Sequence, residues 1–392
     1  MVAYWIMLLW TMIIGFAFIP QSSEQIVLDG DIVDYRPTRG QIWFLISVPL
    51  IFCALRSGFI DTYSYIRGFK ALPPMNVFLE TYADYKSCQL FYGLETVFKY
   101  VFIDNHHCWL TVVAIVQIAC MIKTLHKYSA HIGISFFVFI ASGMIFSWMF
   151  NGIKQFLAAT ILFACVDLIL EKKWLKFAAV LVFFTGFGQI CGFFGWGNPP
   201  WWLCGFHQTA IIMFPIAICC SGKMLNKKVW ILLVFLCLLL ITGLIDPFLE
   251  ASVENSSYVN DLQYLGPEKG MNIWRFFVSL VPPAMVLIRR KQIIEEGTTP
   301  IIDLSVNMSF VSSAIYMIST VTSGIYIGRL PIYCELYNLI LYPWLFMHPY
   351  RKEKKWLFPL MVGLYLFYFV YQMYFAYNQP YRSDVLTIFS AR

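Results

Sequence analysis

Apolar runs of roughly 20 residues recur along this chain of 392 residues, and they limit what it can fold into more than any other feature. A run of this length is what an α-helix needs to cross the hydrocarbon core of a bilayer. The composition agrees, because 59% of the residues are hydrophobic and only 13% are charged, against about a quarter in a soluble domain. The sequence therefore predicts an all-α polytopic membrane protein, with one integral membrane domain over residues 1–392.

About 12 spans are expected from the positions of these runs. They lie near residues 2–20, 41–55, 108–124, 131–149, 152–170, 174–190, 206–221, 229–245, 271–288, 302–325, 331–347 and 356–376. The first run has no basic N-terminal region and no small-residue cleavage site, so we interpret it as a span and not as a removable signal peptide.

The connections between these spans predict the orientation of the chain. Basic connections follow alternate spans, at residues 123–127, 171–176, 223–228, 289–291 and 351–355. Cytoplasmic loops carry such an excess of Lys and Arg, so the net charge of +6 predicts orientation and not a nucleic-acid partner. Alternation then places segment 21–40 in the cytoplasm, despite its four acidic residues, and both termini on the other side.

Three longer segments fall on the outward side. Residues 56–107 form the longest, and their apolar stretch 90–103 is too short to span easily, so we expect a re-entrant or interfacial helix there. Residues 186–205 are rich in Gly, Pro and Trp, and residues 246–270 are acidic. Cys191 and Cys204 lie in one of these segments, where they could pair or stay free; the other reading is that they are buried small hydrophobes.

Two charged residues lie where the second predicted span ends on the outward side. Arg56 can hold a phosphate through two parallel hydrogen bonds. Asp61 could accept a proton from a hydroxyl or hold the Arg in place. The alternative is a structural ion pair at a span end, since interfacial charges are common there.

The fifth predicted span opens with a polar patch. Helical spacing brings Asn151 together with Lys154 and Gln155, at i+3 and i+4. A helix N-terminus attracts anions, and Lys adds a point charge. The alternative is capping of the helix by Asn151, with Lys154 extending to the interface.

Further polar candidates lie at the same outward face. His207 opens the seventh predicted span and could act as a general base, or be a hydrogen-bonded interfacial residue. Glu95 could serve as a base or pair with Lys99 at i+4. Arg329 could bind an anion or anchor its helix.

Several motifs are absent or weak. No Walker A loop, GxGxxG or HExxH is present, so nothing in the sequence supports an ATPase, a dinucleotide enzyme or a zinc protease. His106 and His107 form a poor metal site without other ligands, because adjacent side chains point apart on a helix.

At these residues the chain resembles the EpsG family of Wzy-type polysaccharide polymerases. The resemblance rests on motifs that match in order: LR…DT..Y, E..FK, N..(R/K)Q, FH, a late R…Y and a terminal PY, at Leu55-Arg56, Asp61-Thr62, Tyr65, Glu95, Phe98-Lys99, Asn151, Lys154-Gln155, Phe206-His207, Arg329, Tyr333 and Pro380-Tyr381. The family usually has Arg where this chain has Lys154. Lys keeps the charge but loses the fork of parallel donors.

The resemblance implies a reaction and a place. Such polymerases transfer a growing glycan from undecaprenyl diphosphate to a lipid-linked repeat unit, on the outer face of the bacterial cytoplasmic membrane. It also implies a GT-C-like helical architecture with an extracytoplasmic-facing cavity. The expected partners are undecaprenyl-diphosphate-linked oligosaccharides and membrane lipids. The sequence leaves open whether a chain-length regulator is a further partner.

The resemblance also gives each candidate residue a role. The cations that would bind the diphosphate are Arg56, Lys154 and Arg329. Asp61 or His207 would deprotonate the acceptor hydroxyl, with Glu95 as the reserve base. The groups that would orient the substrate are Asn151, Gln155, Tyr65 and Tyr333. No metal or other cofactor is expected.

Two functions of other classes stay open at this point. The same charges could form the headgroup pathway of a lipid-linked oligosaccharide transporter, although transport should place some charges at mid-membrane. A membrane O-acyltransferase with His207 as base is the other alternative, but no matching motif supports it.

Overall fold

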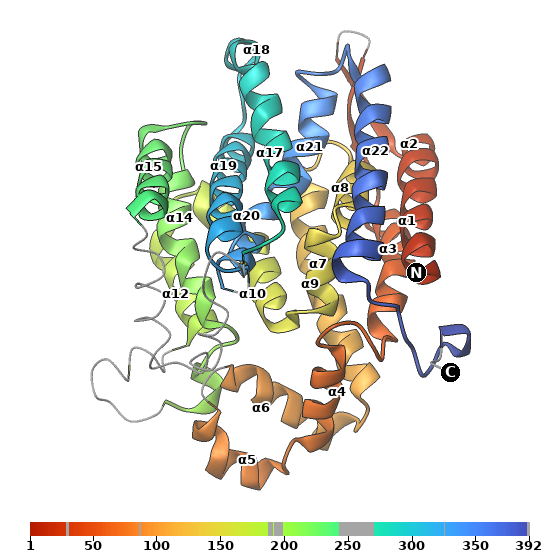
Figure 1. The fold of residues 1–392 in the computed structure, drawn as a ribbon, viewed down its shortest axis with the longest axis vertical. Coiled ribbons are helices and arrows are strands. Elements are labelled where there is room, and N and C mark those ends of the chain that lie inside the picture. Colours follow the sequence, from red (N-terminus) through yellow and green to blue (C-terminus); the bar gives the residue numbers. More distant parts are fainter. Residues whose placement is uncertain are drawn as a thin grey trace.

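The computed structural model of this chain describes residues 1–28, 31–85, 88–186, 191, 199–242, 270–324 and 326–389. Most of these residues are helical, and the longer helices run side by side in one bundle (Figure 1). The apolar runs account for this, because a backbone that borders lipid must satisfy its own hydrogen bonds. The all-α prediction is confirmed, apart from one short hairpin.

The helices of the bundle are α1 (Val2–Ile13) with η1 (Ile14–Phe18) and α2 (Ile19–Ser22), α3 (Arg39–Ala54), α7 (His106–Tyr128), α8 (Ile132–Ala141), α9 (Met144–Phe150), α10 (Ile153–Ala164), α11 (Val166–Leu170), α12 (Trp174–Thr185), α14 (Met213–Cys220), α15 (Lys227–Thr242), α17 (Ile273–Ile288), α19 (Pro300–Val321), α20 (Ile332–Glu335), α21 (Asn338–Met347) and α22 (Lys354–Val370) with η9 (Tyr371–Tyr377). The remaining short elements are α4 (Thr62–Ala71), α5 (Met75–Thr81), η2 (Tyr82–Asp84), α6 (Gln89–Val97), η3 (Phe98–Phe102), η4 (Trp201–Leu203), η5 (Gln208–Ile212), α18 (Arg290–Glu296), η8 (Ile327–Arg329) and η10 (Thr387–Phe389).

Helix lengths support fewer membrane spans than the sequence predicts. Within the described residues, five helical segments are long and apolar enough to cross a membrane: 2–22, 106–128, 201–220, 300–321 and 354–377. A bent pair, α8 with α9, makes a sixth if it is counted as one span. Several other predicted spans correspond to apolar helices of 10–17 residues. The structure therefore confirms apolar helices in these regions, but not 12 full spans.

The bend between α8 and α9 shows why some spans are short. The two helices meet at 73°, and Gly143 at the junction has φ +64. This left-handed conformation costs Gly little and other residues more, so the helix ends there. Hydropathy alone cannot locate such a break, because the residues on both sides are apolar.

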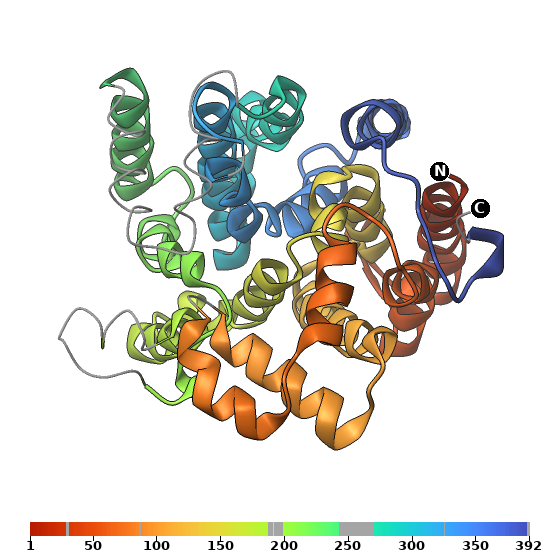
Figure 2. The ribbon, with the colours of Figure 1, turned by 60° about the horizontal axis from the view of Figure 1, so that its bottom comes forward.

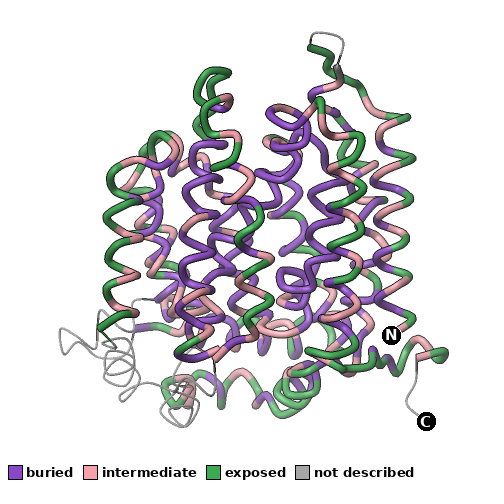
Figure 3. Tube along the Cα trace, turned by 45° about the horizontal axis from the view of Figure 1, so that its top comes forward, coloured by how far each residue is buried: buried purple, intermediate pink, exposed green. Residues whose placement is uncertain are grey.

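One apolar face of each outer helix is exposed. On α1 the exposed side chains are Val2, Ile6, Leu9 and Ile13, and α22 exposes Leu360, Leu364 and Phe367 in the same way. Figure 3 shows the buried residues along the centre of the bundle and the exposed residues along its periphery. An apolar stripe at helical spacing on the outside of a bundle suits contact with lipid.

Helices α4, α5 and α6 form a cap across one end of the bundle (Figures 1 and 2). They occupy most of residues 62–97, inside the predicted outward segment 56–107. The apolar stretch 90–103 forms α6 and η3, so it does not extend into a full span. Lys99 ties the cap together, because its Nζ donates hydrogen bonds to the carbonyls of Phe69, Lys70 and Leu72 at the end of α4.

The predicted cytoplasmic connections gather at the other end. One surface pocket is lined by residues from three of them, including Arg36, Lys127 and Glu171, together with Thr299 just before α19. Arg36 belongs to the hairpin of β1 (Glu24–Leu28) and β2 (Asp31–Arg36), so segment 21–40 lies with the basic connections despite its acids. Helix α18 also lies at this end, opposite the cap (Figure 1).

The other two predicted outward segments are described only in part. Residues 187–190 and 192–198 of the Gly/Pro/Trp segment, and nearly all of the acidic segment 246–270, lie outside the described residues. Cys191 and Cys204 are both free thiols in the structure. The Sγ of Cys204 donates to the carbonyls of Pro199 and Pro200, each at 3.4 Å.

Two glycines let the first span pack closely on α8. A Cβ built on Gly133 would lie 2.1 Å from the carbonyl oxygen of Gly15. No side chain fits at this distance, and small residues are what allow backbones in membrane bundles to approach each other. Gly363 on α22, in contrast, has open space around it.

We expect Gly133→Ala to lower the Tm of the detergent-purified protein, because the methyl group must push η1 away from α8. Overpacking of this kind costs about 1–3 kcal/mol. The matched control Gly363→Ala should leave the Tm unchanged or raise it slightly, since Ala favours the helix. Equal Tm values for the two variants in thermal denaturation would contradict the close packing.

Candidate functional site

A cavity of about 170 Å³ lies where the cap meets the bundle. Its lining is mostly polar and comes from segments far apart in the sequence: Asp61, Tyr65, Cys88, Trp148, Asn151, Gly152, Lys154, Gln155, His207 and Arg329. Most of the predicted site residues are therefore brought together. Three of them, Arg56, Glu95 and Tyr333, are not among the lining residues.

The start of α10 is shaped by a backbone turn at the cavity wall. Asn151 is extended, and Gly152 then takes φ +80. A Cβ on Gly152 would lie 2.5 Å from the ring of Trp148, so no larger residue fits. The amide of Gly152 donates to the Oη of Tyr65 at 2.9 Å. Tyr65 thus attaches α4 of the cap to the N-terminus of α10.

Asn151 offers the cavity an unused acceptor. Its Oδ1 is buried and has no hydrogen-bond partner among the described residues. Buried polar atoms in folded proteins are almost always satisfied, so an orphan at a cavity wall indicates a place for a ligand donor or a water. The capping role considered for Asn151 is not seen, because no side-chain cap is formed at α10.

Lys154 points toward the aromatic side chains of the cap. Its Nζ lies 3.7 Å from the ring centroid of Tyr92 and 5.3 Å from that of Phe91. Aromatic faces attract a cation without neutralising it. The alternative that Lys154 extends away to the interface does not fit this position. The positive charge stays at the cavity.

Arg329 supplies the second cation of the cavity. Gln155 donates its Nε2 to the carbonyl oxygen of Arg329 at 2.9 Å, which fixes the backbone of η8. In the part of the chain that the structure describes, no hydrogen bond or ion pair of the Arg329 guanidinium is seen. Its donors are therefore available to an anion.

Asp61 is the carboxylate of the cavity, at the residue before α4. Burial raises the pKa of Asp61, and the nearby charge of Arg329 opposes this shift. The two do not form one of the ion pairs seen in the described residues, although both line the cavity. A carboxylate with a raised pKa is a stronger base than an exposed one.

His207 is held by a chain of hydroxyl groups. Its Nδ1 lies 2.8 Å from the Oγ1 of Thr209, which lies 3.0 Å from the Oη of Tyr333. The backbone amide of His207 donates to the carbonyl of Phe184. Tyr333 therefore contacts His207 through Thr209 and not directly. Because Nδ1 contacts Thr209, Nε2 is the nitrogen that can exchange a proton with a ligand.

Arg56 lies behind the cavity wall. Only 1% of it is exposed, and its Nε donates to the Oγ1 of Thr62 at 3.1 Å. Its Nη1 bonds the carbonyl of Cys53, and the guanidinium stacks 5.1 Å from the ring of Phe150. Arg56 therefore joins the ends of α3 and α9 to the first residue of α4. Its Nε and Nη1 are engaged within the protein, and a pair with Asp61 is not among the ion pairs of the described residues.

Glu95 is buried in the cap, with 4% exposed. Burial raises its pKa to about 8, against the attraction of the Lys154 ammonium group. The alternative pair with Lys99 is not among the ion pairs of the described residues, because the Lys99 ammonium group turns to the end of α4. Glu95 thus influences the site through Lys154 and does not line the cavity.

Sequence reasoning did not find several residues of this site. Trp148 and Cys88 line the cavity, and Tyr92 and Thr209 hold Lys154 and His207. The only available signal was proximity in sequence, because Thr209 is two residues from His207 and Trp148 is three before Asn151. Nothing in the sequence brings Tyr92 or Cys88 to Lys154, since the cap must first fold back onto α10.

The comparisons with known proteins agree with the order of these motifs. A model described as the EpsG family matches residues 41–189 and 202–383. These ranges include every residue that lines the cavity. No curated protein and no solved structure matches the chain.

The raised pKa of Glu95 predicts how stability depends on pH. The folded protein keeps the Glu95 carboxyl protonated up to about pH 8, whereas an unfolded chain releases this proton at about pH 4.3. The stability that the protonated Glu95 carboxyl contributes is complete below the pKa of the unfolded chain. It is lost as the pH rises through the pKa of the folded protein. Thermal denaturation from about pH 6 to about pH 9 should show the Tm of the wild type falling relative to Glu95→Gln.

The control for this measurement is Glu80→Gln, which changes an exposed carboxylate of the same cap. Its Tm should follow that of the wild type across the whole range. If Glu95→Gln also parallels the wild type at every pH, the buried carboxyl does not titrate as described.

Proposed function

The chain belongs to the EpsG family of Wzy-type polysaccharide polymerases, and we propose that it transfers a growing glycan from undecaprenyl diphosphate to a lipid-linked repeat unit. The transfer would take place at the capped end of the bundle, on the outer face of the bacterial cytoplasmic membrane. The observation that carries this proposal is the cavity itself. Two cations, one carboxylate and one imidazole face a single space beside apolar helices.

Lys154 and Arg329 are the proposed diphosphate ligands. A diphosphate that leaves from a sugar gains negative charge, and fixed cations that face this charge lower the barrier. Arg329 can bind two phosphate oxygens at once, whereas Lys154 acts as a point charge. Arg56 is not assigned to this role, since it is not among the residues that line the cavity. Its Nε and Nη1 bond Thr62 and Cys53, so it positions α4 and the Asp61 at its start.

The proton of the acceptor hydroxyl would move to Asp61 or to His207 Nε2. As the new bond forms between the acceptor oxygen and the anomeric carbon, the bond from that carbon to the diphosphate breaks. The diphosphate leaves with the bonding pair, and the base keeps the proton. Burial supports Asp61 in this role because it raises the pKa of the carboxylate. For His207, the hydroxyl of Thr209 would hold the required tautomer.

Polar and aromatic neighbours would orient the sugars. The free Oδ1 of Asn151 can accept a sugar hydroxyl, and Gln155 holds Arg329 in place through its backbone. Trp148 at the cavity wall provides a flat apolar face for a sugar ring. Tyr65 lines the cavity and holds Gly152, whereas Tyr333 acts one step behind, through Thr209.

Two features favour a transferase over a transporter. The charged residues meet under a cap at one end of the bundle, whereas a transport pathway needs charged or polar groups near the membrane midplane. The cavity also combines cations with a base, and a headgroup pathway requires only the cations.

Polymerisation in vitro tests this assignment. The variants Asp61→Asn, His207→Gln and Arg329→Ala are each compared with the wild type, with the purified lipid-linked repeat unit as substrate. The variant that removes the base should lose about 10²–10⁴-fold in rate, and Arg329→Ala about 10²-fold or more. The products are measured as chain length against time.

The matched control is Asp167→Asn, which removes an ion-paired carboxylate near the predicted cytoplasmic ends of the helices. It should polymerise at the wild-type rate. The assignment is wrong if well-folded Asp61→Asn and His207→Gln both keep full activity, or if Arg329→Ala does.

A further inference from the structure

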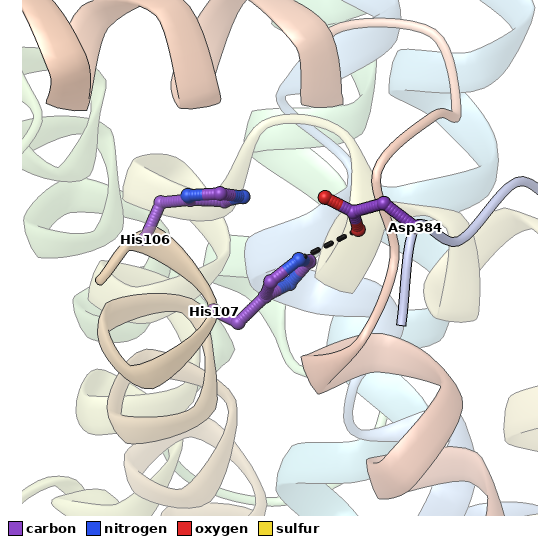
Figure 4. A group of neighbouring side chains, drawn as sticks. All are labelled: His106, His107 and Asp384. Atoms are coloured by element: carbon purple, nitrogen blue, oxygen red, sulfur yellow. Dashed lines mark hydrogen bonds and ion pairs between the residues drawn. The ribbon is translucent and has the colours of Figure 1, made fainter. Parts of the chain in front are cut away.

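Three side chains with metal-binding atoms meet outside the reaction cavity. His106 and His107 begin α7, and Asp384 belongs to the C-terminal tail after η9. One ligand atom from each residue lies within 4.8 Å of the other two. Figure 4 shows both imidazole rings turned toward the Asp384 carboxylate. Within the described residues, this is the one group of at least three such side chains.

The two adjacent histidines converge, contrary to the sequence-based expectation that they point apart. Their ring centroids are 4.2 Å apart. The reason is their position, because His106 is the first residue of α7 and Asn105 before it is extended. The Asn105 side chain accepts from the amides of His107 and Cys108 and fixes this start. The missing third ligand comes from the other end of the chain.

The hydrogen bonds of His107 resemble those of a metal ligand. Its Nδ1 lies 3.3 Å from the carbonyl oxygen of Ala54, and its Nε2 lies 2.7 Å from Asp384 Oδ1. A ligating His usually donates its second nitrogen to a backbone carbonyl, which sets the tautomer and the ring orientation. One nitrogen is thus held by α3, and the other faces the cluster.

His106 contributes an unsatisfied atom. Its Nε2 is buried and has no hydrogen-bond partner among the described residues. Leaving a buried imidazole nitrogen unpaired is unfavourable. A cation between the two rings and the carboxylate would use this nitrogen.

We propose that His106, His107 and Asp384 bind a divalent transition-metal ion, with Zn²⁺ as the expected species, and that this ion fastens the C-terminal tail to α7. Two imidazoles and a carboxylate suit Zn²⁺, with water as the fourth ligand. The proposal concerns binding and stability, and it does not rest on the proposed transferase function.

The present geometry needs a small adjustment to hold the ion. Tetrahedral Zn²⁺ with ligand bonds near 2.0–2.2 Å keeps its ligand atoms about 3.4 Å apart. The 2.7 Å contact between His107 and Asp384 must therefore open, while the wider pairs must close. Asp384 can move for this purpose, because 57% of its side chain is exposed and it lies on a tail.

The tail that Asp384 belongs to already binds next to the reaction cavity. The carbonyl of Arg382 accepts from the amide of Ser57 at 2.8 Å, and Ser383 Oγ donates to Leu55 at 2.5 Å. Tyr381 Oη donates to Phe52 at 2.9 Å. The tail therefore packs on the segment that leads from α3 to Asp61. A metal at Asp384 would add a cross-link from this segment to α7.

The test is metal binding by the full chain, purified in detergent and stripped with chelator. Zn²⁺ titration by calorimetry should give one tight site in the wild type. His106→Ala and Asp384→Asn should each weaken its Kd by more than about tenfold, since even outer-shell changes cost this much. The control His126→Ala alters a histidine in the last turn of α7 and should bind as the wild type does. His107 is left intact because it also supports α3.

Two further measurements identify the ligands. Co²⁺ in place of Zn²⁺ should show ligand-field absorption of a nitrogen and oxygen site, which Asp384→Asn weakens. Zn²⁺ should raise the Tm of the wild type and of His126→Ala, but not of His106→Ala. The proposal is overturned by no binding to the wild type, by equal Kd values in His106→Ala, or by a thiolate charge-transfer band that places the ion on cysteines.

Discussion

The site is built around two partly buried cations, Lys154 and Arg329. Neither forms an ion pair among the described residues. Lys154 lies against aromatic rings and interacts electrostatically with the Glu95 carboxyl. The backbone carbonyl of Arg329 accepts a hydrogen bond from Gln155. Positive charge beside apolar helices is costly without a partner. The cap of α4–α6 lowers this cost by covering Lys154 with Tyr92 and Phe91, and it leaves a polar cavity. An anionic ligand such as a diphosphate would complete the compensation.

Tight packing behind the cavity keeps these charges in place. Buried Arg56 hydrogen-bonds α3 and α4 and lies over the Phe150 ring of α9, and Tyr65 attaches α4 to the start of α10. Thr209 and Tyr333 hold the ring of His207. The groups that would react line the cavity; of the groups that orient them, Tyr65 also lines it, whereas Arg56, Thr209 and Tyr333 are not among its lining residues. A preorganised site of this kind needs no rearrangement as charge develops.

Much of this could be predicted from the sequence, for physical reasons that also explain the failures. Polar residues at one end of apolar runs are costly there, and the cavity collects Asp61, Asn151, Lys154, His207 and Arg329 as expected. Arg56 belongs to the same pattern, yet it does not line the cavity and its Nε and Nη1 bond groups of the protein, which spacing cannot reveal. The 12 full spans are not confirmed within the described residues, where breaks such as the one at Gly143 interrupt apolar runs without changing hydropathy. The pairing of His107 with Asp384 joins residues 277 positions apart, so only the folded chain shows it.

We propose that a lipid diphosphate binds between Lys154 and Arg329 under the cap. The most direct measurement is a cryo-electron microscopy structure of the full chain with undecaprenyl diphosphate. The proposed reaction releases this lipid whichever sugar is transferred. We expect phosphate density within hydrogen-bond distance of both cations, with Asp61 and His207 facing the adjoining space. Phosphate density at the opposite end of the bundle, beside Arg36 and Lys127, would contradict it.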